Sequence, residues 1–176
     1  MAAKALQDPT IIDAVVADHR NVTAMIARCL QATKDGDHDL AASLATAVTV
    51  DVLLHSRAEE AVLYPFMEGK LGKEGHSFTE HSNREHAELE GKLVAAVLAG
   101  REGDWTGMAQ QMGEAEKAFE HHRHDEEDKY LPKLAQASQA GELRELTAQW
   151  AEAKRKAPLR ELSGPLAKSS WETAGL

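Results

Sequence analysis

Histidine and acidic side chains are concentrated in residues 121–128, where three imidazoles and four carboxylates fall within eight positions. Imidazole and carboxylate are ligands for iron, manganese and zinc, so this stretch could hold a metal. The surrounding sequence, HHRHDEEDKYLP, otherwise reads as a helix. Residues four apart on a helix differ by about 40° around its axis, which places His122 and Glu126 on one face. The same spacing recurs at His55 and Glu59, so the chain carries two such pairs.

An internal repeat relates these two pairs. His55 and Glu59 recur 67 residues later as His122 and Glu126. Two single histidines and two prolines keep the same separation: His19 and His86, and Pro65 and Pro132. Two helical hairpins of one design would be related by an approximate twofold axis. The repeat therefore predicts that four imidazoles and two carboxylates converge near that axis.

The elements that must position these residues are all predicted to be helices. Apolar residues recur at intervals of three and four, and the few Gly and Pro cluster between the segments. Five helical segments are expected, at about 9–34 with Thr10 as its start signal, 37–68, 77–99, 104–137 and 141–158. Four long helices joined by short loops predict an all-α, up-down-up-down four-helix bundle over residues 9–137. Residues 138–176 would form an additional C-terminal helix and a loosely held tail, and another all-helical packing is the alternative.

The histidines and the two glutamates lie within the apolar stripes of their helices, and the carboxylates therefore need partners. An unpartnered carboxylate taken out of water costs several kcal/mol, more than the about 1.5–3 kcal/mol gained by burying one apolar side chain. Structural ion pairs between His and Glu are one solution. Bound cations are the other, since a cation neutralises carboxylates and accepts imidazole lone pairs. Two cations bridged by Glu59 and Glu126, each with two histidines, fit the symmetric set best.

These motifs resemble the hemerythrin-like, or HHE cation-binding, family. The resemblance covers about residues 14–134 and rests on His19, HSRAEEAVLYP, His86 and HHRHDEEDKYLP. It implies a four-helix bundle with a non-haem di-iron centre that binds dioxygen, reacts with peroxide or nitric oxide, or senses iron. By motif match the metal ligands would be His19, His55, Glu59, His86, His122 and Glu126. The implied cofactor is two iron ions, with manganese or zinc as alternatives that the ligand types also allow.

One position departs from the family pattern. Oxygen-carrying members place two histidines four apart on the third helix, so the partner of His86 would be residue 82, which here is Ser82. His81 lies about 140° from His86 on a regular helix and could reach the metal through a π-bulge. His81 is therefore a seventh candidate ligand. Without it one iron would be more open, which favours reactivity or sensing over oxygen transport.

Other polar residues of the motifs are expected outside the ligand set. Glu60 and Glu127 lie about 100° from the bridging positions, which favours a solvated or supporting role over ligation. Tyr64 and Tyr130 could donate a hydrogen bond to a ligand, with packing as the alternative. Cys29 falls in the first apolar stripe and is expected to be a buried thiol.

Composition argues against several classes of partner. The formal net charge of -9 disfavours nucleic acid and anionic lipid. No run approaches the roughly 18 apolar residues that a membrane span needs, and the first residues lack the features of a signal peptide. The single cysteine excludes an intramolecular disulfide, and a cytoplasmic location is expected. The expected partners are dioxygen, peroxide or nitric oxide, without nucleic acid or membrane; a protein partner is left unspecified.

The sequence therefore predicts a di-iron protein that binds dioxygen or related small oxidants. Peroxide breakdown of the catalase type is compatible with such a centre, and no catalytic residue is predicted beyond the metal ligands. An iron- or oxygen-sensing module without turnover is the alternative, although the chain offers no separate output domain. A structural zinc site without a redox role is the third hypothesis.

Overall fold

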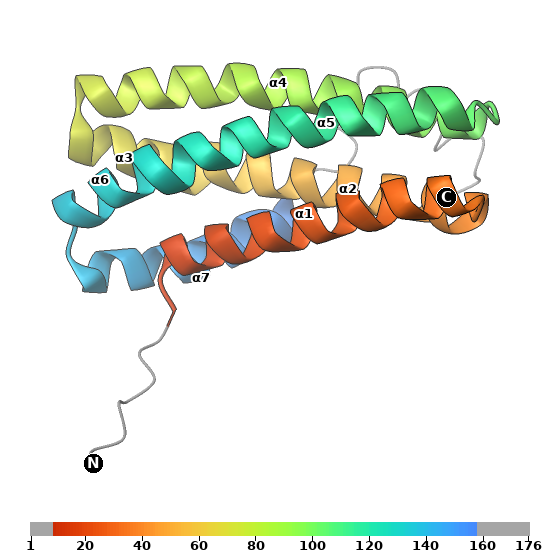
Figure 1. Cartoon of the computed structure of the whole chain (residues 1–176). Coiled ribbons are helices and arrows are strands. Elements are labelled where there is room, and N and C mark those ends of the chain that lie inside the picture. Colours follow the sequence, from red (N-terminus) through yellow and green to blue (C-terminus); the bar gives the residue numbers. More distant parts are fainter. Residues whose placement is uncertain (1–8, 158–176) are drawn as a thin grey trace, which may run out of the picture.

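The protein is helical throughout the part that the structure describes. The computed structural model describes residues 9–157, which form α-helices and two short π-helical turns, with no strand among them (Figure 1). The elements in chain order are α1 (Ile11–Asp35), α2 (His38–Ala58), η1 (Glu59–Leu63), α3 (Tyr64–Leu71), α4 (Lys73–Arg101), α5 (Trp105–Asp125), η2 (Glu126–Tyr130), α6 (Leu131–Ala137) and α7 (Ala140–Lys156). The all-α prediction is confirmed.

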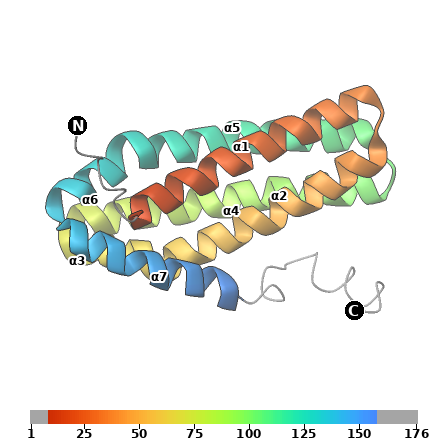
Figure 2. The ribbon, with the colours of Figure 1, turned by 90° about the horizontal axis from the view of Figure 1, so that it is seen from below.

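Four long helices, α1, α2, α4 and α5, lie side by side as a bundle (Figures 1 and 2). α1 contacts both α2 and α5, and α4 contacts both α5 and α2. α3 continues the direction of α2 beyond η1, and α6 continues that of α5 beyond η2 (Figure 1). The predicted fifth helix, α7, packs outside the bundle against α1, α2 and η1. The predicted tail lies outside the described residues.

Helix boundaries differ from the predicted segments mainly around the second and third helices. The expected second helix is divided by η1 and ends at Leu71, and the expected fourth helix is divided by η2. α4 begins at Lys73, four residues earlier than expected, because Gly72 makes the sharp turn alone with a φ of 59°. At the other end of the bundle, Thr10 starts α1 as predicted. Its hydroxyl accepts the Asp13 N–H at 3.3 Å, and the Asp13 carboxylate accepts the Thr10 N–H at 2.8 Å.

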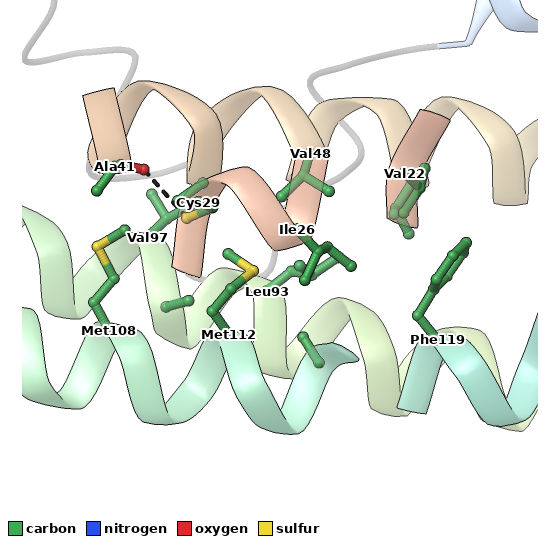
Figure 3. Close-up of a cluster of buried hydrophobic side chains, with 14 of the residues drawn as sticks. Val22, Ile26, Cys29, Ala41, Val48, Leu93, Val97, Met108, Met112 and Phe119 are labelled. Carbon is green, nitrogen blue, oxygen red and sulfur yellow. Dashed lines mark hydrogen bonds between the residues drawn. The ribbon is translucent and has the colours of Figure 1, made fainter. Parts of the chain in front are cut away.

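Two apolar clusters form the core. One occupies the half of the bundle near the α1–α2 and α4–α5 connections, where Met108, Met112 and Phe119 of α5 face Ile26 and other α1 residues (Figure 3). The other joins the ends of the bundle to α3, α6 and α7. Along α1, for example, His19 separates Val15 of the second cluster from Val22 of the first. The bundle thus has a polar layer enclosed by apolar packing on both sides.

Cys29 belongs to the first of these clusters and is buried, as predicted. Its thiol donates to the Ala41 carbonyl oxygen at 3.4 Å (Figure 3). Burial raises the pKa of this thiol to about 11, so the reactive thiolate is rare at neutral pH. The thiol therefore serves packing between α1 and α2.

The continuous helical run His38–Leu71 is long and apolar enough to cross a membrane by length and composition alone. This differs from the sequence expectation. Part of this run serves core packing: 44% of its most apolar window is buried inside the bundle, including Val48 and Val52. Core helices of soluble proteins meet the same criterion, so the run is weak evidence for a membrane span.

The close crossing of α3 and α4 depends on Gly75. A Cβ at this position would lie 2.5 Å from the Met67 carbonyl oxygen and 2.9 Å from the Glu68 Cα. Because backbone atoms cannot move aside without displacing a helix, Gly75→Ala is expected to lower the free energy of unfolding by about 1–3 kcal/mol. Gly69→Ala on α3 is the matched control, since its Cβ would meet no atom within 4 Å. Urea denaturation should show the control unchanged or more stable; equal losses in both variants would contradict the close-approach argument.

Candidate metal centre

Six of the side chains predicted as ligands meet in the polar layer of the bundle. Each comes from a different element, and none is more than 2% exposed. They are His19 on α1, His55 on α2, Glu59 on η1, His86 on α4, His122 on α5 and Glu126 on η2. The fold therefore buries two carboxylates and four imidazoles in one place.

The imidazole Nε2 atoms face the two carboxylates. Around Glu59, His86 Nε2 lies 3.0 Å from Oε2 and His55 Nε2 lies 3.2 Å from Oε1. Around Glu126, the distances to Oε2 are 3.4 Å from His19 Nε2 and 3.6 Å from His122 Nε2. Each carboxylate thus has two imidazoles within reach. His86 Nε2 also lies 3.3 Å from His122 Nε2, which joins the two halves.

The donor set fits bound cations. One ligand atom from each of five of these residues, all except His86, lies within 4.8 Å of the others. Four buried atoms at the centre have no hydrogen-bond partner: His19 Nε2, His55 Nε2, Glu59 Oε1 and Glu126 Oε2. Leaving a buried polar atom unpartnered costs about 1–3 kcal/mol. Cations coordinated by these lone pairs would remove that cost, and mixed imidazole and carboxylate ligands suit iron, zinc or manganese.

The two glutamates begin π-helical turns, which the sequence analysis did not predict for these segments. In η1 the Tyr64 N–H donates to the Glu59 carbonyl oxygen, five residues back, and in η2 the Leu131 N–H donates to that of Glu126. The next residue in each case is proline, Pro65 or Pro132. Proline has no N–H and its ring crowds the carbonyl four residues back, so the regular ladder cannot continue there. The repeated prolines are the sequence signal for these turns.

Each imidazole directs its Nδ1 outward toward a further acidic side chain. Such contacts fix the ring orientation and tautomer, and leave Nε2 free to bind a metal. The four Nδ1–carboxylate contacts are Glu127–His19 at 2.9 Å, Glu85–His122 at 3.1 Å, Asp18–His55 at 3.3 Å and a looser Glu60–His86 at 3.8 Å. They obey the 67-residue repeat, so both halves of the centre have the same outer supports.

Two of these supporting residues, Asp18 and Glu85, were missed by sequence reasoning. Each directly precedes a single histidine of the repeat, in DHR and EHA. Consecutive residues on a helix point about 100° apart, so Asp18 contacts His55 on the next helix and does not contact the histidine beside it. The repeated acidic residue before each single histidine was the available signal.

Electrostatics at the centre favour protons on His55 and His86 when no cation is bound. Burial alone would lower the pKa of His55, but Glu59 and Asp18 outweigh it and raise that pKa to about 10. Glu59 and Glu60 likewise outweigh burial at His86 and raise its pKa to about 9. Although burial opposes its ionisation, the histidines hold the pKa of Glu59 well below its ordinary value. A cation that binds here therefore displaces protons from the imidazoles.

Tyr64 breaks the twofold symmetry. Its hydroxyl lies 3.2 Å from Glu59 Oε2, 3.3 Å from Glu126 Oε1 and 3.3 Å from His86 Nε2. The repeat-related residue is Leu131, so only one copy of the repeat supplies a phenol, which contacts the glutamates of both halves. Burial, together with the charges of the two glutamates, raises the pKa of Tyr64 well above its ordinary value. Tyr64 therefore brings a protonated hydroxyl into the centre.

His81 is not brought into this set. α4 is α-helical from Lys73 to Arg101, without the π-bulge that the sequence analysis invoked for it. The His81 side chain is 37% exposed, and its Nε2 lies 3.2 Å from both Glu85 Oε1 and Asp125 Oδ2. On a regular helix it points to the flank of α5, while Ser82 is fully buried. His81 thus belongs to a separate group of side chains.

α7 covers the α1–α2 side of the centre, which the sequence did not predict. The Trp150 ring meets the His55 ring edge to face, with centroids 5.3 Å apart. Lys154 Nζ lies 2.7 Å from Asp18 Oδ2, the oxygen that also faces His55. Burial would raise the pKa of Asp18, but its bonds with His55 and Lys154 lower it, so Asp18 stays charged at neutral pH. The fifth helix therefore supports His55 indirectly.

Comparison with known proteins agrees with this geometry. The model of the hemerythrin HHE cation-binding domain matches residues 10–134. That range begins just before α1, ends within α6 and includes all six side chains of the centre. Comparison with characterised proteins and with solved structures gives no match.

Proposed function

Because the chain belongs to the hemerythrin HHE cation-binding family, we propose that it is a non-haem di-iron protein that binds dioxygen or reacts with peroxide or nitric oxide. Family membership and the buried His/Glu cluster indicate metal binding, typically of iron. The number of ions, their identity and the reaction are our proposal. So is the up-down-up-down arrangement of the four long helices, which the pairing of each with two others supports.

The observation that carries the proposal is the doubled, buried donor set. Each half offers two imidazoles and one carboxylate, and Glu59 and Glu126 lie where both halves meet. This supports two ions that the six side chains would hold, with Glu59 and Glu126 within reach of both. Two iron ions held there would supply two electrons and an open position for a small oxidant. The structure offers six ligands from the chain for two ions, which leaves room for such a molecule.

The surrounding side chains would control access and protons. Apolar clusters on both sides of the layer limit water, which would otherwise compete for open positions and weaken electrostatic contacts. The Tyr64 hydroxyl holds its proton beside Glu59, Glu126 and His86, where it can donate a hydrogen bond. Because only one copy of the repeat supplies this hydroxyl, the donor makes the centre asymmetric.

An iron- or oxygen-sensing role is the second candidate. The contact of Lys154 with Asp18 favours it, because this contact links His55 to the surface helix α7. Under either role we propose small oxidants as ligands and a cytoplasmic location, without a membrane or nucleic acid partner.

The proposal is tested with protein loaded with ferrous iron in the absence of oxygen. Two retained iron ions per chain, followed by an absorption change with dioxygen or gas evolution with peroxide, are expected. Nitric oxide provides a third probe. Zinc-loaded protein is the control, since zinc has no redox chemistry. Iron that is retained but unchanged by all three oxidants would contradict the proposed reaction and favour sensing.

A further inference from the structure

The two halves of the centre differ in what lies outside their supporting acids. Asp18, which supports His55, is covered by α7 through Lys154 at 2.7 Å. Its repeat-related counterpart, Glu85, instead lines a surface pocket of about 530 Å³ between α4 and α5. His81 and His121 line the same pocket. α7 therefore covers one side of the centre, whereas the other side faces a surface pocket lined by His81 and His121.

A second group of metal-binding side chains lies at this pocket. His81 Nε2 is 3.2 Å from Glu85 Oε1 and 3.2 Å from Asp125 Oδ2, and the three can offer ligand atoms within 4.8 Å of one another. The Nε2 atom is itself buried and has no hydrogen-bond partner, although two carboxylate oxygens are near. His121 Nδ1 lies 3.0 Å from the same Glu85 oxygen. An imidazole nitrogen and two carboxylate oxygens this close together can be held by a proton on the imidazole or by a cation that all three bind.

We propose that His81, Glu85 and Asp125 form an outer binding site for a divalent transition-metal cation, from which the buried centre is loaded. One imidazole and two carboxylates suit ferrous iron, manganese or zinc, and water would complete the coordination on the open side. Lys129 Nζ, 2.5 Å from Asp125 Oδ1, occupies the other oxygen of that carboxylate and fixes its orientation. A protonated His81 paired with the two acids, without metal, is the competing interpretation that the test must exclude.

Glu85 connects the outer site to the buried centre. Its Oε1 faces His81, while its Oε2 accepts the Nδ1–H of His122 at 3.1 Å. A cation at the outer site would therefore be linked through the Glu85 carboxylate to His122, a predicted ligand of the buried centre. The loading role rests on the proposed metal-binding function, whereas the outer site itself depends only on its own three side chains.

The test compares metal content in the full chain and in His81→Ala. His81 is the residue to change, because Glu85 and Asp125 contact or adjoin residues of the buried centre. His76→Ala on the same helix is the matched control, since His76 also lies near two acids, 3.3 Å from Glu68 and 3.6 Å from Glu80, but is 62% exposed. After equilibrium dialysis against Zn²⁺, we expect three ions per chain in the wild type and His76→Ala, and two in His81→Ala.

Two other outcomes would overturn the outer site: equal metal content in the wild type and His81→Ala, or an equal loss in His76→Ala. A wild type that binds a single ion, lost in His81→Ala, would keep the outer site and contradict the buried di-metal centre. The loading role has its own readout. Uptake of ferrous iron into the buried centre should be several-fold slower in His81→Ala with the same final content, and unchanged rates would overturn that role.

Discussion

Replacing His122 with alanine is expected to remove at least one of the two metal ions and to lower the melting temperature of the metal-loaded protein. His122 Nε2 lies 3.6 Å from Glu126 and 3.9 Å from Glu59. Removing this imidazole should therefore weaken metal binding in both halves of the centre. A ligand at about 100 times its Kd stabilises a fold by about 2.7 kcal/mol. At about 2–4 °C per kcal/mol for a domain of this size, the melting temperature should fall by about 5–10 °C.

Metal analysis and thermal unfolding of iron-loaded protein measure this result. His124→Ala is the control on the same turn of α5, because the His124 side chain is 64% exposed and its Nδ1 lies 2.7 Å from the exposed Asp128. The control should retain both ions and its melting temperature. The metal-free forms of the wild type and His122→Ala should differ less than the loaded forms. Unchanged metal content in His122→Ala would remove this residue from the centre.

The buried His/Glu cluster was largely predictable, because local spacing in the sequence places its residues on common helix faces. His55 and Glu59 share a helix face by virtue of a four-residue separation, and the repeat supplies the same pair at His122 and Glu126. A buried carboxylate needs a partner, so the predicted burial of Glu59 and Glu126 indicates a bound cation or an ion pair at that place. These residues could be identified without knowing how the helices pack against one another.

The remaining features depend on contacts between elements, which the spacing of residues within one helix does not specify. Asp18 supports a histidine on another helix, and Trp150 meets His55 only after α7 folds back over α1 and α2. The π turns are an intermediate case. Pro65 and Pro132 are visible in the repeat, but the sequence analysis does not infer from them that the backbone hydrogen-bond pattern changes there. A π-bulge was instead considered as a way for His81 to reach the metal, but α4 is regular there.

Replacing Trp150 with alanine should have the largest effect on stability. Trp150 is 4% exposed and joins α7 to the cluster that includes Leu143 and Leu146. Truncating a buried tryptophan to alanine costs about 3–5 kcal/mol, because apolar contacts are lost and a cavity remains. Urea denaturation of metal-free protein should show a loss of this size. The cause is packing of α7, so the loss should not depend on metal.

The same substitution should also weaken metal binding on the side of His55. Without the Trp150 ring, water reaches His55, and α7 no longer holds Lys154 against Asp18. Loss of such outer support typically reduces metal affinity by about 10–100-fold, which competition with a chelator would measure. Trp105→Ala is the matched control, because Trp105 stacks on His38 at the far end of the bundle, with centroids 4.2 Å apart. Equal loss of affinity in both variants would indicate general destabilisation and not support of His55 by α7.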